Sequence, residues 1–185
     1  WWSNPVLLES DGVATVPDAV VLVSSGFTGA FDINADGVSA IAVGEVHFHV
    51  IGRRRVWIEG LLTSTTTSEP VDVEGSSLVV VNASALQGSG DQGLDITASN
   101  AVWVRDSVSW DNRQGVEIKD STYVGLQRVT AARNDRDGIS LVGSSRCALS
   151  EVNATQNFDP GAASTGYGVV LQDSEQNVLE RVIAA

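Results

Sequence analysis

The stretch GLDITASNAVWVRDSVSWDNRQGVEI, residues 93–118, begins and ends with the same four-residue pattern. Gly93 and Gly115 lie 22 residues apart, and each is followed by an apolar residue, an acid and a second apolar residue. Apolar residues at alternate positions are typical of a β-strand with one buried face. The acid between them faces the other way, so Asp95 and Glu117 are expected at equivalent outward positions.

A glycine followed by two apolar residues at alternate positions recurs further along the chain. Gly138 and Gly168 open two more such segments, at spacings of 23 and 30 residues, with Ser140 and Val170 in place of the acid. Each segment continues with a serine that opens a second strand and an apolar residue that opens a third. Three of the segments then carry an asparagine, namely Asn112, Asn134 and Asn157. We expect the glycine to turn the chain at the corner where each repeat begins.

A repeat of 22 to 23 residues that contains only short strands restricts the fold. Leucine-rich repeats have a similar period, but they need a Leu-x-x-Leu-x-Leu-x-x-Asn strand that this sequence lacks. A propeller blade needs about twice the length, and a helical solenoid needs a 3.6-residue period. The sequence therefore predicts an all-β fold, a right-handed parallel β-helix (solenoid) of about seven to eight coils with 22–23 residues in each.

With its Gly-Ile-x-Leu, Ser and Asn positions, the sequence resembles the pectate-lyase-like β-helix superfamily, in its short-repeat form. The resemblance covers Val46 to Val182 well and the first 45 residues poorly. It implies the fold more than the activity, because enzymes, tailspikes and adhesins share this architecture. The more specific motifs Arg-x-Pro-x-x-Arg and Gly-His-Gly are absent, as is an Asp-Asp pair followed by a catalytic His.

The chain is predicted to form a single domain over residues 1–185. Residues 46–185 are expected to hold the regular coils, and residues 1–45 to form irregular N-terminal coils or a cap. Residues 158–167 have no counterpart in the other repeats, which predicts an inserted loop just before the first strand of a coil. Such a loop serves either as a wall beside a binding surface or as a tolerated surface insertion.

Composition narrows the function classes. The net charge is −12, and an acidic surface repels phosphate backbones, so we expect no nucleic-acid partner. No apolar run reaches the ~18 residues that a membrane span needs. Cys147 is the only cysteine, which excludes an internal disulfide. The sequence begins with Trp1 rather than Met and resembles a β-helix, so we expect a secreted or cell-surface protein.

Outward residues of successive coils stack in columns about 4.8 Å apart in such a fold. The first column runs through the opening strand of each coil and contains His49, Asp72, Asp95, Glu117, Ser140 and Val170. The second, two residues further on, contains Ile51, Glu74, Thr97, Lys119, Val142 and Gln172. Three stacked carboxylates raise one another's pKa unless a cation or a basic side chain intervenes. They predict either a cation site or a solvated acidic ladder.

In lyases and polygalacturonases of the resembled superfamily, this opening sheet carries the active site. The lyases use acidic residues for Ca²⁺ and a Lys or Arg as the base. The resemblance therefore implies Asp72, Asp95 and Glu117 as calcium ligands, with Lys119, Asp95 and Glu117 as catalytic candidates. Adjacent carboxylates would be ~5 Å apart and alternate ones ~10 Å, which brackets the separations in retaining and inverting glycosidases.

A second candidate for calcium is DINADG, residues 32–37, which matches the start of a calcium loop through Asp32, Asn34 and Asp36. The twelfth position of such a loop needs a bidentate acid, but Val43 occupies it and Glu45 comes two residues too late. The alternative is a solvated turn between strands.

Candidates for substrate contact lie outside the acidic column. Trp57 and Trp103 are expected to face outward on the second strand, two coils apart, where they can stack on sugar rings, pack in an interface or be covered by the N-terminal segment. Arg53 and Arg55 belong to the only basic cluster, GRRRVW, which lies close to His49. This cluster would hold the carboxylates or sulfates of an anionic polymer, or form a solvated turn.

Two functions remain open at this stage. The first is an extracellular protein that binds a polysaccharide or cell-surface glycan, and cleaves it by cation-assisted elimination if it is an enzyme of the lyase or glycoside hydrolase type. The second is a structural or adhesive rod, such as a filament subunit, tail fibre or adhesin, that associates end to end. Apolar residues near both termini, Trp1 at one end and Val182 and Ile183 at the other, favour such stacking.

Overall fold

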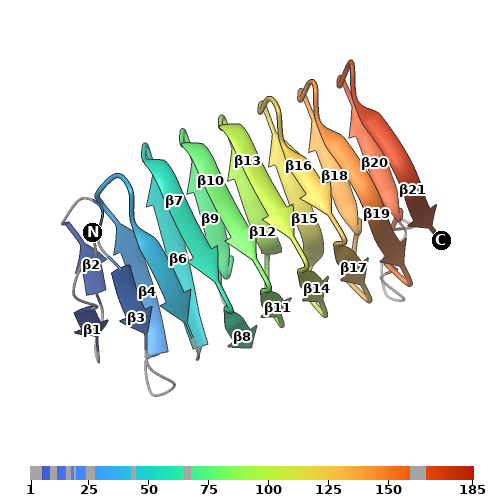
Figure 1. Ribbon diagram of the computed structural model, residues 1–185. Helices are drawn as coiled ribbons and strands as arrows, with labels where there is room; N and C mark the ends of the chain where they lie inside the picture. The colour runs from blue at the N-terminus through green and yellow to red at the C-terminus, as the bar shows by residue number, and fades with distance from the viewer. Residues whose placement is uncertain are drawn as a thin grey trace.

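The computed structural model describes residues 6–8, 12–15, 18, 20–23, 28–42, 45–64, 68–158 and 166–185. Its strands stack side by side along one axis and run in order from the N-terminal to the C-terminal end (Figure 1). Every pairing between the described strands is parallel, and no helix occurs among the described elements. The fold is the predicted right-handed parallel β-helix.

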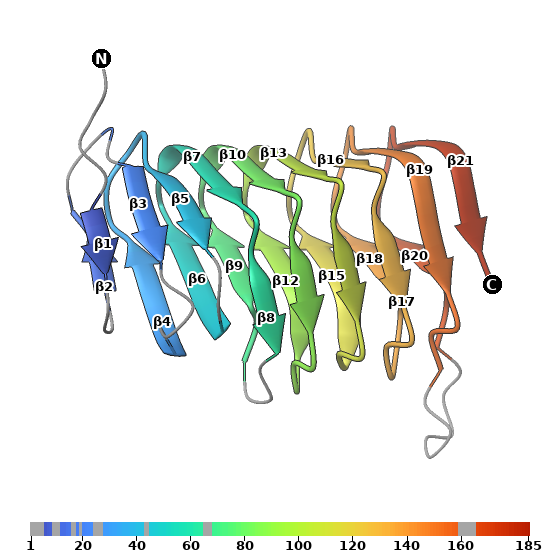
Figure 2. The same ribbon diagram turned by 60° about the horizontal axis from the view of Figure 1, so that its bottom comes forward.

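One side of the solenoid is the opening sheet, formed by the first strand of each coil. Its eight strands follow one another in chain order: β2 Gly12–Ala14, β4 Thr28–Ile33, β6 Glu45–Ile51, β9 Val71–Glu74, β12 Gln92–Thr97, β15 Gln114–Lys119, β18 Ile139–Val142 and β20 Val169–Gln172. Figure 2 shows these strands as one continuous layer behind the strands of the other two sides of the solenoid.

The other two sides belong to one bent sheet of 13 strands. The second side contains β1 Val6–Leu8, β3 Val20–Val23, β5 Ser39–Ala42, β7 Arg54–Glu59, β10 Ser77–Asn82, β13 Asn100–Arg105 and β16 Gly125–Gln127. The third side contains β8 Leu62–Ser64, β11 Ala85–Gln87, β14 Val108–Trp110 and β17 Thr130–Ala132. Both sides share the long strands β19 Ala148–Thr155 and β21 Val178–Ala184.

Five consecutive coils, from β6 to β19, have strands on all three sides and a neighbouring coil at both ends. The strands before β6 and after β19 belong to coils with fewer strands or with a neighbour at one end only. The predicted number of about seven to eight regular coils is therefore somewhat too high. The predicted insertion at 158–167 lies mostly outside the described residues, as do the N-terminal tryptophans.

The core is a set of apolar columns inside the solenoid. On the opening sheet, the first residue of the alternating pair stacks in register through Phe48, Val71, Leu94, Val116 and Ile139, all of which are buried. Phe31 extends this column and meets Phe48 edge to face, with ring centroids 5.5 Å apart. Stacking like on like buries each side chain between two neighbours, so stability accumulates coil by coil.

The repeated glycine has a different role from the one predicted. Gly115 lies inside β15 and its φ is not positive, so it does not turn the corner. A Cβ at this position would collide with the carbonyl oxygen of Gly138 and come within 2.8 Å of the Asn134 amide nitrogen. The glycine is therefore needed for close packing against a buried asparagine, and other residues turn the corners.

The repeated asparagines form a buried ladder inside the corner between the third side and the opening sheet. The backbone N–H of Asn112 donates to Oδ1 of Asn134 at 3.1 Å, and the N–H of Asn134 donates to Oδ1 of Asn157 at the same distance. The Asn134 side chain donates to Oδ1 of Asn157 at 2.9 Å. These bonds satisfy backbone groups that the corner leaves without strand partners.

At the exposed corners, acidic and basic residues alternate from one coil to the next. Residues with positive φ occupy the corners, among them Asp106, Arg128 and Glu151, which are equivalent residues of successive coils. The Arg128 guanidinium donates from Nη2 to Asp106 at 2.8 Å, and Arg133 pairs with Asp111 in the same way at the next corner. The Arg–carboxylate contact thus joins one coil to the next.

The last coil is less covered than the others. Its apolar side chains are exposed, with Leu171 at 44%, Leu179 at 42% and Ile183 at 61%. Equivalent positions one coil earlier, such as Leu141 and Leu149, are fully buried. The described part of the chain contains no helix that is long and apolar enough to cross a membrane.

Candidate functional site

The register of the opening sheet confirms the predicted outward columns. His49 pairs with Asp72, Asp72 with Asp95, and Asp95 with Glu117, before Ser140 and Val170 complete the column. At the N-terminal end the column gains Asp32, which pairs with His49. The three adjacent acids are half-buried and lie on three neighbouring strands, β9, β12 and β15. We call Asp72, Asp95 and Glu117 the acidic column.

Asp95, in the middle of the acidic column, has the most perturbed carboxyl group. The pKa of Asp95 is raised to about 6, mainly by burial, and the negative charges of Glu117, Asp72 and Glu69 contribute to this rise. The Thr97 hydroxyl donates to Oδ1 of Asp95 at 3.1 Å and opposes this shift. A carboxyl group with this pKa exchanges its proton near neutral pH, as a general acid or base must.

The two neighbours of Asp95 are held in different ways. Burial raises the pKa of Asp72, the charge on His49 lowers it, and Glu69 and Glu74 raise it again. Glu117 accepts a hydrogen bond of 2.7 Å from Nε2 of Gln92, a residue of the preceding coil. The contacts of Glu69 and Gln92 with the acidic column could not be predicted from the sequence, because they depend on how the coils stack.

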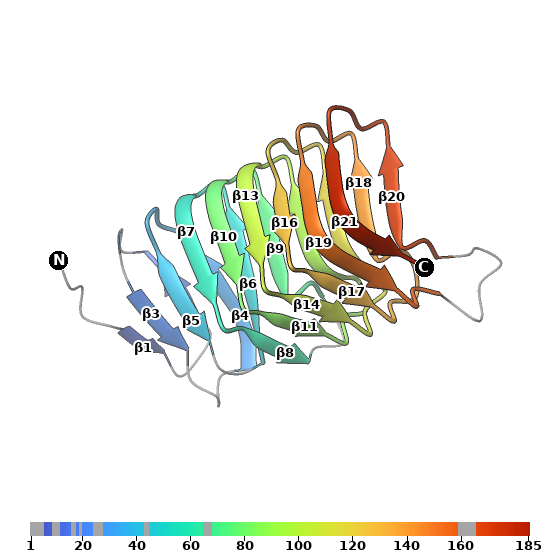
Figure 3. The same cartoon turned by 45° about the vertical axis from the view of Figure 1, so that its right-hand side comes forward.

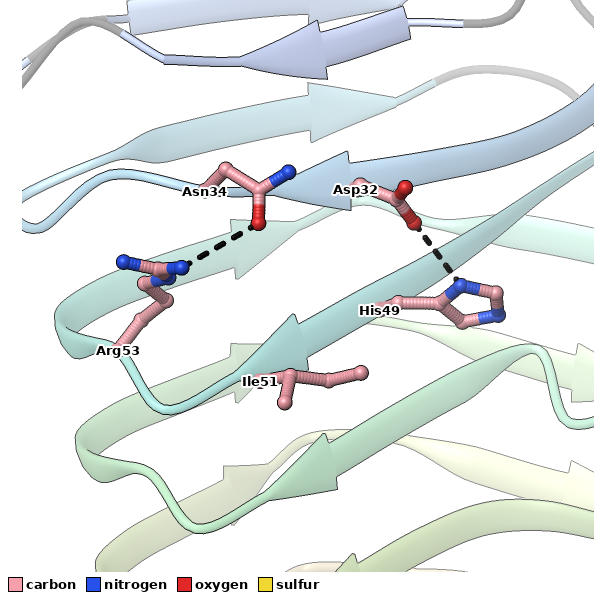
Figure 4. A pocket seen from close by; sticks show the side chains of 5 residues that line it. All are labelled: Asp32, Asn34, His49, Ile51 and Arg53. Atoms are coloured by element: carbon pink, nitrogen blue, oxygen red, sulfur yellow. Dashed lines mark hydrogen bonds and ion pairs between the residues drawn. The ribbon is translucent and has the colours of Figure 1, made fainter.

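At the N-terminal end of the column, His49 and Asp32 form a pair. Nδ1 of His49 lies 3.0 Å from Oδ1 of Asp32, and both side chains are partly exposed. Figure 4 shows this pair on one side of a shallow hollow that Asn34, Ile51 and Arg53 complete. The Arg53 guanidinium donates to Oδ1 of Asn34 at 3.4 Å across the hollow. The predicted binding residues His49 and Arg53 are thus brought together.

DINADG uses its oxygens within the protein. Asp32 contacts His49, Asn34 accepts from Arg53, and Oδ1 of Asp36 accepts from the backbone N–H of Arg54 at 2.9 Å. A calcium ion here would have to replace these donors. Among the described residues, no three His, Cys, Asp or Glu side chains are grouped so that they could hold a metal ion. Calcium at DINADG, or at the acidic column, therefore stays a prediction.

The remaining predicted residues lie outside the acidic column. Lys119 is exposed in the second column, in register with Thr97 and two residues beyond Glu117 on β15. Arg55 lies on the second side and approaches Asp18 at 3.7 Å. Trp57 and Trp103 are in register through Val80, as predicted, but they also lie on the second side.

A second histidine on β6 was not predicted as a site residue. Nδ1 of His47 lies 2.7 Å from Oγ of Ser68. Burial lowers the pKa of His47, the charge on His49 lowers it further, and a backbone hydrogen bond and the charge of Glu69 oppose the shift. His47 therefore favours its neutral form next to the His49–Asp32 pair.

Comparison with known proteins identifies the family. A family model described as a right handed beta helix region matches residues 34–183. This chain belongs to that family. No curated protein matches the sequence.

Solved structures show which β-helix proteins share this architecture. An alginate lyase from Paenibacillus sp. str. FPU-7 is similar with a TM-score of 0.65 and 11% identity, over 95% of this chain and 76% of the lyase. The enzymatically active domain of tailspike protein 2 from bacteriophage CBA120 has a TM-score of 0.56 and 11% identity, over 98% of this chain and 38% of the tailspike domain.

A third structure, ORF18 of Geobacillus virus E2, is similar with a TM-score of 0.52 and 8% identity. It covers 98% of this β-helix chain, which spans 53% of the viral chain. At these levels of identity the similarity shows the fold alone.

Proposed function

We propose that this β-helix protein binds a polysaccharide along the opening sheet and cleaves it by acid–base chemistry centred on Asp95. The observation that carries the proposal is the register of the acidic column: three half-buried carboxyls on adjacent strands, with the pKa of Asp95 raised to about 6. Two proteins with the same architecture are an alginate lyase and an enzymatically active tailspike domain, which supports a glycan substrate.

The acidic column provides the two carboxyl groups that cleavage of a glycosidic bond requires. Asp95 holds a proton up to about pH 6 and would donate it to the leaving oxygen. Glu117, held by the hydrogen bond from Gln92, would act as the second carboxyl group. Neighbouring strands place adjacent carboxyls ~5 Å apart, which matches the separation in retaining glycosidases.

An acidic polysaccharide would require a cation at this surface, because the acidic column repels the carboxylates of such a substrate. For such a substrate we propose elimination as the alternative reaction, in which Asp72, Asp95 and Glu117 would hold Ca²⁺, Lys119 would be the base and Asp95 would not serve as a proton donor. The exposed position of Lys119, two residues beyond Glu117 on the same strand, supports its access to a substrate on this face. Binding that is lost in chelator would favour elimination over hydrolysis.

The test compares Asp95→Asn with Asp106→Asn, a matched change at a corner away from the opening sheet. The substrates are alginate, polygalacturonate and a neutral glucan, each with calcium or with chelator. We expect new reducing ends with the unaltered protein and with Asp106→Asn, and a loss of at least ~100-fold with Asp95→Asn. Ultraviolet absorbance of unsaturated products separates elimination from hydrolysis. Equal rates for the two variants would contradict the proposal.

A second candidate, a rod that associates end to end on a cell or virus surface, is supported by the architecture that this chain shares with a tailspike protein. Unpaired strand edges at an end of a β-helix can pair with another chain. Sedimentation over a range of protein concentrations tests this. Concentration-dependent polymers that disappear in Ile183→Lys would support the rod, and a monomer at all concentrations would exclude it.

A further inference from the structure

The second side of the solenoid has a surface hollow between β13, β16 and β19, which lie next to one another in Figure 3. The outward column here runs through Trp103, Gly125 and Ala148 in register. A large aromatic residue is thus followed by the two smallest residues. This drop in size leaves a step on the sheet surface, with the indole as its wall.

Gly125 allows the indole to lie against the sheet. A Cβ at Gly125 would be 2.9 Å from Cδ1 of Trp103, closer than side-chain atoms tolerate. The half-buried indole therefore leans over the glycine of the next coil. Within the described part of the chain its N–H has no hydrogen-bond partner, whereas the N–H of Trp57 donates to Glu59 at 3.0 Å. Of the two tryptophans, only Trp103 has both a hollow beside it and a free donor.

Tyr123 and Arg146 form the other wall of the hollow. Tyr123 is 50% exposed, and the Arg146 guanidinium carbon lies 5.5 Å from the centroid of its ring. Nη1 of Arg146 donates to the tyrosine hydroxyl at 3.2 Å, and Nε donates to Gln176 at 3.0 Å. These contacts fix the guanidinium beside the hollow, so it needs little ordering when a ligand binds.

The charge of Arg146 is not compensated by an acid. Arg113, Arg128 and Arg133 each pair with an aspartate 22 residues earlier, whereas a tyrosine takes that place beside Arg146. No carboxylate of the described residues lies within ion-pair distance of Arg146. A guanidinium has five N–H donors, and two of them are used here. The others remain for an anionic oxygen.

We propose that this hollow binds a sugar unit that carries a carboxylate or sulfate group. The C–H face of the sugar would stack on Trp103 and Tyr123, and the anionic group would accept hydrogen bonds from Arg146. The site lies on a different sheet from the acidic column and does not depend on Asp95. It would hold an anionic glycan to the solenoid whether or not the opening sheet cleaves that glycan.

The test measures binding of a short oligogalacturonate and of an uncharged maltooligosaccharide of the same length by calorimetry. Asp95→Asn serves as the background, so that the charged probe is not cleaved. We expect Trp103→Ala to weaken binding of oligogalacturonate roughly tenfold. Arg146→Gln should weaken it by a similar factor and remove its salt dependence, with little effect on the uncharged probe.

Trp57→Ala is the matched control, since it removes a tryptophan from the same outward column without touching the hollow. It should leave the affinity unchanged, and Gly125→Ala should weaken binding by displacing the indole. Circular dichroism establishes that each variant is folded, and Trp103→Phe replaces Trp103→Ala if it is not. Affinity that is unaffected by Arg146→Gln, or equal losses with Trp57→Ala and Trp103→Ala, would overturn the proposal.

Discussion

The corners and the opening sheet of this β-helix both stack charged residues one coil apart, but they do so with opposite outcomes. At the corners an aspartate of one coil meets an arginine of the next, as in Asp106–Arg128 and Asp111–Arg133. The arginine lowers the pKa of Asp106 and of Asp111 through a side-chain hydrogen bond. On the opening sheet, acid meets acid, and burial, with a smaller contribution from the neighbouring negative charges, raises the pKa values of Asp72 and Asp95.

The difference shows that the stacking of coils does not by itself require acidic residues to lie next to one another. The same coil spacing accommodates opposite charges at two corners, so the fold can pair its acids where only stability matters. Like charges in register on neighbouring strands lower stability. Three of them on one face, without an arginine between them, are what a surface needs if it must exchange protons or hold a cation.

The largest expected effect comes from placing an arginine in the acidic column, so that acid and arginine pair there as they do at the corners. Glu117→Arg would place a guanidinium in register with Asp95, which would lower the raised pKa of that carboxyl. We expect the unfolding midpoint to rise and glycan cleavage to fall by at least ~100-fold, because neither a proton donor nor a second carboxyl group remains. Glu117→Gln, which can still accept from Gln92, is the control for loss of the negative charge alone. Cleavage that survives Glu117→Arg would contradict the role of the column.

The next effect is the pH dependence of stability. The folded chain holds the Asp95 proton more tightly than the unfolded chain, so the free energy of unfolding should fall as pH rises from about 4 to about 6 and then level off. The shift from 3.8 to about 6 corresponds to about 3 kcal/mol, and solvent screening of this half-buried carboxyl lowers the expected loss to about 2 kcal/mol. Asp72 contributes with the same sign. Urea unfolding across this range should show a smaller slope for Asp95→Asn, while Asp106→Asn keeps the full slope. Parallel curves for all three proteins would exclude the shift.

A smaller effect is expected from Thr97→Val, which removes the hydrogen bond that stabilises the Asp95 carboxylate. The pKa of Asp95 should then rise above about 6, and the pH of half-maximal cleavage should move upward with it. The change in unfolding free energy should stay below about 1 kcal/mol at low pH, where Asp95 is protonated. A downward shift of the pH profile would show that Thr97 acts in another way.

The smallest effect should come from the corner. Arg128→Gln would return the lowered pKa of Asp106 toward its ordinary value. Thermal unfolding at neutral pH should barely change, because both partners are exposed and water screens their attraction. Any difference at low salt should disappear at high salt. A large, salt-independent loss of stability would mean that the corner pairs hold the coils together.

The fold and its register could be predicted from the sequence because the repeat appears directly in the letters. Gly-apolar-acid-apolar, repeated after 22 residues, predicts that Asp95 lies beside Glu117, and the strand pairing confirms it. Periodicity fixes which face a residue takes and which residue it stacks on.

Contacts that depend on side-chain length could not be predicted in this way. Asp32 and His49 fall in one column, but their pairing depends on how the irregular N-terminal coils align with the regular ones. The packing role of Gly115 becomes visible only when the asparagine ladder is seen beside it. Tyr123 and Arg146 lie 23 residues apart, like many pairs in the chain, and nothing in the sequence distinguishes them.

The most direct test is a carbon NMR titration that follows the side-chain carboxyls of Asp95 and Asp106 in the unaltered protein. The account predicts that Asp95 titrates at about 6 and Asp106 below its ordinary value of 3.8, although both are aspartates stacked on a charged residue of a neighbouring coil. If Asp95 titrates near 3.8 as well, its carboxyl is an ordinary solvated acid, and this result would contradict the proposal that the opening sheet is the functional site.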